Sequence, residues 1–289
     1  MGFVFLSIVF FLFQNIANKE YSGRFKTDST TLSHFHLFSH IAMVLSLLLF
    51  GASFSLPAGA LVLSFLYACA FLSAIMMLMK TYSMGPAGKT ALIVNLSMLL
   101  SVVLGFIIWK EKISVYRIIG IPCVLMCLLL SVPGKSEDIG KGGRKWLLFA
   151  IITFFLDGSL SIIQKTFISI YPDQSVEAFV LDSAVFGLMI TIVLNILGFS
   201  LKKIEMPRRE NMLLFLLLAL AVGASTGIAT MFNMQALNIL DGVIVFPVRQ
   251  GGLIVLVTVY GIIRYKDKFD LKCAFMMLFG LAGIVLLNL

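Results

Sequence analysis

Charged residues are scarce in this sequence. Only 12% of the 289 residues are Asp, Glu, Lys or Arg, whereas 60% are hydrophobic. An ordinary soluble domain carries about a quarter charged residues, and a folded core of this size cannot hide so much apolar surface from water. The shortage of charge therefore excludes a soluble globular enzyme and an intrinsically disordered protein.

Cysteine and histidine are also rare. The four cysteines lie in apolar segments, where thiols behave as small hydrophobes, so a disulfide-stapled secreted domain is excluded. The three histidines are His34, His36 and His40, and the last two share one helical face. Membrane di-iron centres and zinc sites need more ligands than these residues supply. The sequence also has no phosphate-binding loop, and we predict neither a metal nor a cofactor.

What the sequence does have is long continuous apolar runs. A spanning helix needs about 20 such residues, whereas a spanning strand would show alternation over about 10. We therefore predict an all-α integral membrane protein with ten transmembrane helices, with soft boundaries near 78–95 and 233–250. The expected spans are 2–18, 31–51, 58–83, 88–109, 115–132, 146–167, 177–199, 211–235, 242–264 and 271–289.

The net charge of +8 comes from basic residues that are spread among short loops, which does not favour nucleic acid as a partner. Most of them follow the odd-numbered spans, near residues 19–26, 80–89, 135–145, 202–209 and 264–272. The loops after the even-numbered spans hold only Lys110, Lys112, Arg117 and Lys165. Because basic loops stay on the cytoplasmic side, we predict external termini for a multi-pass protein of the bacterial cytoplasmic membrane.

Two ungapped matches indicate an internal repeat. Leu100–Lys112 aligns on Leu256–Lys268 with an offset of 156, and residues 11–19 align on residues 157–165 with an offset of 146. Each match pairs one span with the fifth span after it. Since five is odd, the two halves must lie inverted in the membrane.

The repeat predicts two inverted five-helix halves, 1–134 and 146–289, joined by a linker at 135–145. Inverted repeats are a recurring device of secondary transporters, which bind substrate near the midplane between the halves. We expect the first, third, fourth, sixth, eighth and ninth spans to line a central cavity.

The repeated motifs resemble those of the drug/metabolite transporter superfamily, in its EamA-like branch. Lys19 and Lys165 close equivalent spans, and the endings at 109–112 (WKEK) and 265–268 (YKDK) are similar to the family's fourth-helix ending. The family's first repeat helix reads W-G-S followed by a Lys. Residues 157–159 (DGS) and Lys165 match this motif, except that Asp157 stands in place of the Trp. The resemblance implies a secondary carrier without a cofactor. It also implies cytoplasmic termini, against which the charge distribution argues.

Polar groups at membrane depth are functional candidates because each costs at least a few kcal/mol there. Cations outnumber acids among them, which favours a substrate with a carboxylate or phosphate. The predicted substrate-binding residues are Lys19, Lys80, Tyr82, Asn95, Asp157, Lys165, Asn233, Gln235 and Arg249.

Structural roles remain open for several of these residues. Lysines at span ends can snorkel to the headgroups, and amide side chains can join helices. Asp157 is an alternative partner for Lys165, and Asp157 or Asp182 for Arg249. We expect Glu111 and Asp267 to form local ion pairs with the lysines beside them.

The function that we predict is export of a small polar metabolite, such as an amino acid or another carboxylate, by alternating access. Protons are a candidate coupling ion. The first alternative is proton-coupled efflux of lipophilic cations through Asp157, and the second is a membrane-embedded enzyme or an accessory subunit.

Overall fold

The structure is a computed structural model that describes residues 1–25, 29–84, 90, 93–111, 114–131, 143–200, 211–265 and 271–287. The described chain is helical and contains no strand, which confirms the all-α class. Its helices are α1 (Gly2–Arg24), α2 (Ser29–Leu49), α3 (Ala58–Met84), α5 (Met98–Ile107), α6 (Val115–Ser131), α7 (Gly143–Ile170), α8 (Val176–Ser200), α9 (Met212–Ile239), α10 (Gly242–Tyr265) and α11 (Leu271–Leu287).

Several helices are long and apolar enough to cross a bilayer. Among the described residues these lie at Thr31–Leu49, Ala58–Leu78, Arg144–Ile170, Val176–Gly198 and Met212–Ile239. Shorter apolar helices lie at Gly2–Asn18, Ile93–Ile107, Ile118–Leu130, Gly242–Val257 and Leu271–Leu287. Large hydrophobic side chains such as Leu49, Leu213 and Leu271 cover the outer surface, as a lipid environment requires. The protein is therefore a helical membrane protein.

Some helices continue beyond the apolar runs that predicted them. α1 extends to Arg24 and α7 begins at Gly143, although the expected spans ended at 18 and began at 146. The apolar run marks the part of a helix that fits the hydrocarbon, whereas the backbone continues its hydrogen bonds into the headgroup region. The fourth segment is less regular, because helical residues 93–95 and a turn at 96–97 precede α5.

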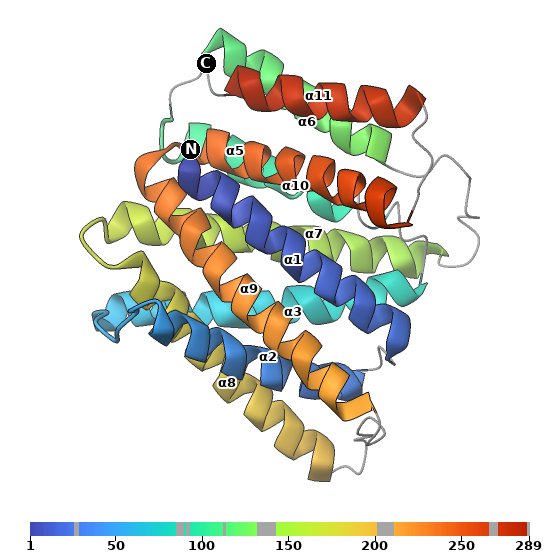
Figure 1. The fold of residues 1–289 in the computed structure, drawn as a ribbon. Coiled ribbons are helices and arrows are strands. Elements are labelled where there is room, and N and C mark those ends of the chain that lie inside the picture. Colours follow the sequence, from blue (N-terminus) through green and yellow to red (C-terminus); the bar gives the residue numbers. More distant parts are fainter. Residues whose placement is uncertain are drawn as a thin grey trace.

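The helices pack in pairs that are far apart in the sequence (Figure 1). α1 and α2 both pack on α9, and α3 packs on α7 and α8. α2 also contacts α8, and α6 pairs with α11. α10 contacts α1, α5, α6 and α11, so it lies among helices from both ends of the chain.

Glycine permits the close crossing of α2 and α9. A Cβ atom at Gly223 would overlap the carbonyl group of Ser39, and one at Gly227 would stand 2.9 Å from Cγ of Met43. The two glycines are four residues apart on one face of α9, which is the small-residue spacing that lets membrane helices approach each other. A cluster of aromatic rings, including Tyr21, Phe35 and Phe215, then joins α1, α2 and α9 near one end of the bundle.

We predict that Gly223→Ala destabilises the protein by about 1–3 kcal/mol, because the backbone of Ser39 must move to admit the methyl group. Gly251→Ala in α10 is the matched control, since its Cβ would meet only Val124 side-chain atoms at ordinary contact distances. Thermal unfolding of the two purified variants in detergent measures the difference. Equal melting temperatures for both variants would contradict the close approach.

Candidate functional site

A cavity of about 530 Å³ lies in the centre of the bundle. Its walls come from α1, α3, α7, α9, α10 and residues 94–95, which are the six segments expected around a central cavity. Its aromatic and aliphatic walls include Phe11, Phe71 and Leu253. The polar residues that line it are Gln14, Asn15, Asn18, Tyr67, Asn95, Asp157, Ser161, Gln164, Thr230, Arg249 and Gln250.

Arg249 brings a positive charge into this cavity. It follows Pro247 in α10, and its guanidinium carbon lies 5.2 Å from the centroid of the Phe11 ring on α1. Its Nε is buried and has no hydrogen-bond partner among the described residues. A guanidinium group that stacks on an aromatic face and keeps donors available is suited to bind a carboxylate or phosphate.

Asp157 brings a negative charge into the same cavity from α7. The Ser97 hydroxyl donates a hydrogen bond to its Oδ2 at 2.5 Å. Within the described chain no ion pair joins Asp157 to Arg249, and Asp182 does not pair with Arg249 either. The two opposite charges are therefore not in direct contact, although they attract each other across the cavity lining, and both line a space large enough for a small ligand.

Amide side chains form the rest of the polar wall. Gln250 donates to Asn95 Oδ1 across the cavity lining, which joins α10 to the segment before α5. Gln164 donates to the Tyr67 hydroxyl at 3.0 Å and accepts from Asn233 Nδ2 at 3.0 Å. Asn233 does not line the cavity, and instead it fixes Gln164, which does.

Lys165 does not belong to the cavity. Its Nζ lies 2.6 Å from Glu111 Oε1, and both side chains are largely buried. The predicted alternative of a Lys165–Asp157 pair is thus wrong, because Lys165 pairs with Glu111. The expected local pair of Glu111 with Lys112 lies outside the described residues.

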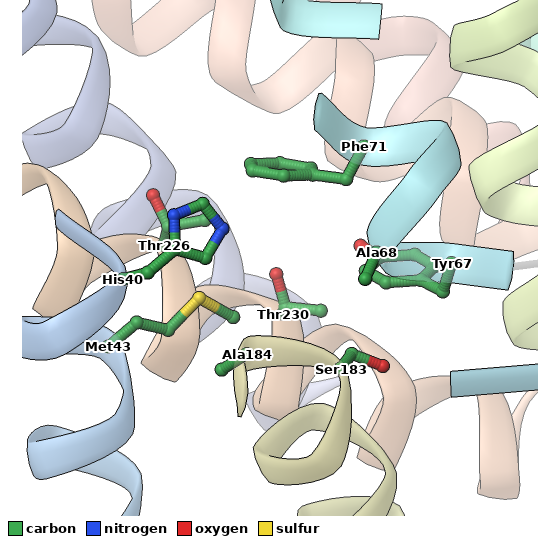
Figure 2. Close-up of a pocket in the computed structure, with 9 residues that line it drawn as sticks. All are labelled: His40, Met43, Tyr67, Ala68, Phe71, Ser183, Ala184, Thr226 and Thr230. Carbon is green, nitrogen blue, oxygen red and sulfur yellow. The ribbon is translucent and has the colours of Figure 1, made fainter. Parts of the chain in front are cut away.

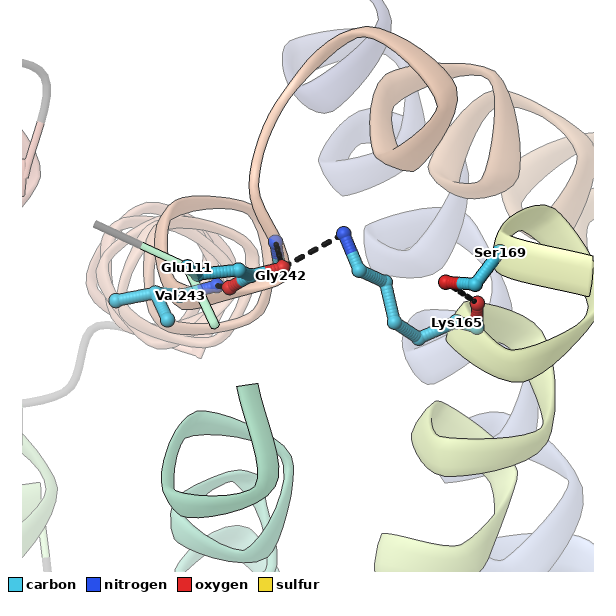
Figure 3. Close-up of polar contacts among 5 residues, drawn as sticks. All are labelled: Glu111, Lys165, Ser169, Gly242 and Val243. Atoms are coloured by element: carbon cyan, nitrogen blue, oxygen red, sulfur yellow. Dashed lines mark hydrogen bonds and ion pairs between the residues drawn. The ribbon is translucent and has the colours of Figure 1, made fainter. Parts of the chain in front are cut away.

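The Glu111 carboxylate also caps α10 (Figure 3). Its two oxygens accept the backbone N–H groups of Gly242 and Val243, each at 3.0 Å. The first N–H groups of a helix lack partners within the helix and carry partial positive charge, so a carboxylate is well placed there. One side chain thus joins the ends of α5 and α7 to the start of α10, next to the cavity residue Gln164.

The remaining predicted site residues lie away from the cavity or outside the described part of the chain. Lys80 is exposed at the end of α3, with Nζ 4.6 Å from the centroid of the Phe149 ring. Gln235 donates to Glu177 at the start of α8. The side chains of Lys19 and Tyr82 lie outside the described part, as does Asp267. Of the nine predicted residues, the structure brings Asn95, Asp157 and Arg249 together in the cavity wall.

Several wall residues on α1 and α7 are not among the predicted site residues, although the predicted repeat relates their positions. The lining positions on α1 are Phe11, Gln14, Asn15 and Asn18. With the offset of 146 they fall on 157, 160, 161 and 164, which are the four lining positions on α7.

Among the described residues, no group of three or more His, Cys, Asp or Glu side chains is placed to hold a metal ion.

Comparison with known proteins shows that the fold occurs in solved structures and indicates nothing about function. No protein-family model matches the chain, and no curated protein matches it. Solved structures do match, among them a chain described only as "Crystal structure of protein", with a TM-score of 0.77 and 13% sequence identity. The alignment covers 98% of this chain and 94% of that one. At this identity the similarity extends to the fold and carries no function.

We predict that Glu111→Gln and Lys165→Gln are strongly coupled. Removing one partner leaves a buried charge uncompensated, which costs about 3–5 kcal/mol, whereas removing both costs less than the sum. Thermal unfolding of the two single variants and the double variant gives the coupling free energy. Additive effects would show that the pair does not connect α5, α7 and α10 energetically.

Proposed function

We propose that this protein is a secondary active transporter of a small polar metabolite and a member of the drug/metabolite transporter superfamily, in its EamA-like branch. One observation carries the proposal. Arg249 and Asp157, which form no ion pair with each other, both line a central cavity of about 530 Å³ in a helical membrane protein. Buried charges are expensive at membrane depth and typically mark a pathway for a substrate or an ion.

The helix packing supports ten spans in two inverted halves, 1–134 and 146–289. Under the repeat, α1, α2, α3, α5 and α6 correspond to α7, α8, α9, α10 and α11. The contact of α1 with α9 then corresponds to that of α7 with α3, and the contact of α1 with α10 to that of α7 with α5. The pairs α2–α8, α5–α10 and α6–α11 each join equivalent helices. The agreement of lining positions on α1 and α7 supports the same symmetry.

The charges in the cavity favour a zwitterionic substrate such as an amino acid. Lys165 is neutralised by Glu111 and Lys80 is exposed outside the cavity, so neither adds to a basic site. Among the described residues, the charged groups that line the cavity are one guanidinium and one carboxylate. In the bound state Arg249 holds the carboxylate of the substrate, and Asp157 with the amide groups of the wall holds its ammonium group.

The position of the cavity supports alternating access with loading from the cytoplasm. Asn18, Leu78 and Val257 extend the lining toward the ends of α1, α3 and α10. The loops at those ends are rich in basic residues and are predicted to be cytoplasmic. The Lys165–Glu111 pair lies at the opposite end of the bundle and holds it together. Export then requires that the halves move so that the cavity opens at the end with this pair.

We predict that Arg249→Ala lowers kcat/KM for amino-acid transport by at least about 100-fold, since a charged hydrogen bond contributes about 1.5–3 kcal/mol and two are lost. The measurement is uptake of a labelled amino-acid mixture into proteoliposomes. Lys80→Ala is the control, because Lys80 lies outside the cavity. Unchanged transport by Arg249→Ala would overturn the proposal.

Efflux of lipophilic cations remains the second candidate, and the position of Asp157 near the aromatic wall residues Phe11 and Phe71 favours it. It predicts that Asp157→Asn abolishes transport of tetraphenylphosphonium driven by a pH gradient, because the exchanging carboxylate is lost. Arg249→Ala would retain that transport. Amino-acid transport by the wild type without cation transport excludes this candidate.

A further inference from the structure

Buried histidines lie on α2, outside the central cavity. His34, His36 and His40 are each less than a tenth exposed. Among the described residues neither ring nitrogen of His34 has a hydrogen-bond partner, and Nε2 of His36 has none. Nδ1 of His40 lies 2.7 Å from the His36 carbonyl oxygen. A carbonyl accepts only, so His40 carries its hydrogen on Nδ1 and keeps a lone pair on Nε2.

Two small pockets flank the His40 ring, and each has a volume of about 10 Å³, room for about one water molecule. The first lies between α2, α3, α8 and α9, and its polar groups belong to His40, Tyr67, Ser183, Thr226 and Thr230 (Figure 2). The second is lined by Gln14, His36, Ser39, His40 and Thr226. The surface of each pocket is mostly apolar, and these residues supply its polar part.

Both pockets adjoin the central cavity. Tyr67, Phe71 and Thr230 line the first pocket and the cavity alike. Gln14, Phe71 and Ile75 line the second pocket and the cavity. A single layer of side chains thus separates His40 from the substrate site, and water molecules in the pockets would complete a proton path to it.

The polar and titratable groups around His40 indicate that His40 accepts the proton. On its own helix the His36 ring lies 6.5 Å away, centroid to centroid, and repulsion between two imidazolium rings limits the pair to one proton. Of the polar groups beside His40, α3 contributes the Tyr67 hydroxyl, and α9 contributes the hydroxyls of Thr226 and Thr230. α8 contributes Gly187, on which the ring packs, and the hydroxyl group of Ser183. α1 contributes the neutral Gln14.

We propose that His40 is the binding site of the coupling proton, which it accepts at Nε2 from water that reaches the pockets from the central cavity. The inference rests on the proposed transport function. The proton moves from a hydronium ion to the imidazole lone pair and returns to water when the cycle resets, so no other bond changes. His36 is a positioning residue, because its carbonyl group fixes the tautomer of His40.

The first experiment measures coupling in proteoliposomes with a labelled amino-acid mixture. One coupled proton under a gradient of one pH unit supports a substrate gradient of roughly tenfold. We expect the accumulation ratio of His40→Gln to be about one, because the coupled proton is lost. The reference is exchange measured without a pH gradient. His34→Gln is the matched control, since His34 is buried on the same helix but lines neither pocket. Wild-type accumulation by His40→Gln overturns the proposal.

A second experiment does not depend on the substrate. Nitrogen NMR of histidine-labelled protein in nanodiscs follows each imidazole, with assignment by His34→Gln, His36→Gln and His40→Gln. We expect His40 to be the Nδ1–H tautomer and to gain a proton as the pH is lowered from 8.5 to 4.5, the range around the ordinary titration of histidine. A His40 signal that does not change overturns the coupling site, even if the wild type transports amino acids. Absence of amino-acid transport with a titrating His40 contradicts the proposed substrate alone.

Discussion

Every polar group inside a bilayer must find its hydrogen-bond partner within the protein, and this constraint explains most of the contacts in the bundle. Small hydroxyl residues meet it locally, as Ser39 and Thr226 do by donating to backbone carbonyl groups one turn earlier. Larger groups need other helices. Asn195 donates to Ser33 on α2, and Lys165 pairs with Glu111. Several buried polar atoms of the described residues have no such partner, and among them only the Nε of Arg249 belongs to a residue that lines the central cavity.

Glu111 shows how the same constraint connects the two predicted halves. Its carboxylate satisfies two backbone N–H groups of α10 and the charge of Lys165 on α7, both beyond the linker at 135–145. All three partners would be left unsatisfied in lipid if the carboxylate moved away. Opening that end of the bundle therefore requires either water or a replacement partner. Under the proposed alternating access, this requirement would make the contact a barrier between conformations as well as a source of stability.

The sequence predicted the helices well because apolar runs depend on the bilayer thickness and not on tertiary detail. It predicted that Asn95, Asp157 and Arg249 lie in the wall of a central cavity, and all three line the cavity. It did not predict rotation about the helix axis, which partner helices determine. Asn233 and Gln235 were therefore assigned to the cavity, although one lies behind Gln164 and the other contacts Glu177. Glu111 was assigned to its own loop because nothing in the sequence indicates that α10 begins beside it.

The repeat also shows where the two halves differ. Positions 11 and 157 are equivalent under the predicted repeat, and both line the cavity, yet one is Phe and the other Asp. Phe11 lies beneath the Arg249 guanidinium, whereas Asp157 accepts a hydrogen bond from Ser97. A symmetric pair of charges would bind a symmetric ligand equally in two orientations. Under the proposed function, the difference separates a positive from a negative pole, so that a zwitterion would bind in one orientation only. In the proposed transporter, the symmetry of the two halves permits alternating access, and the difference between positions 11 and 157 determines how the substrate is oriented.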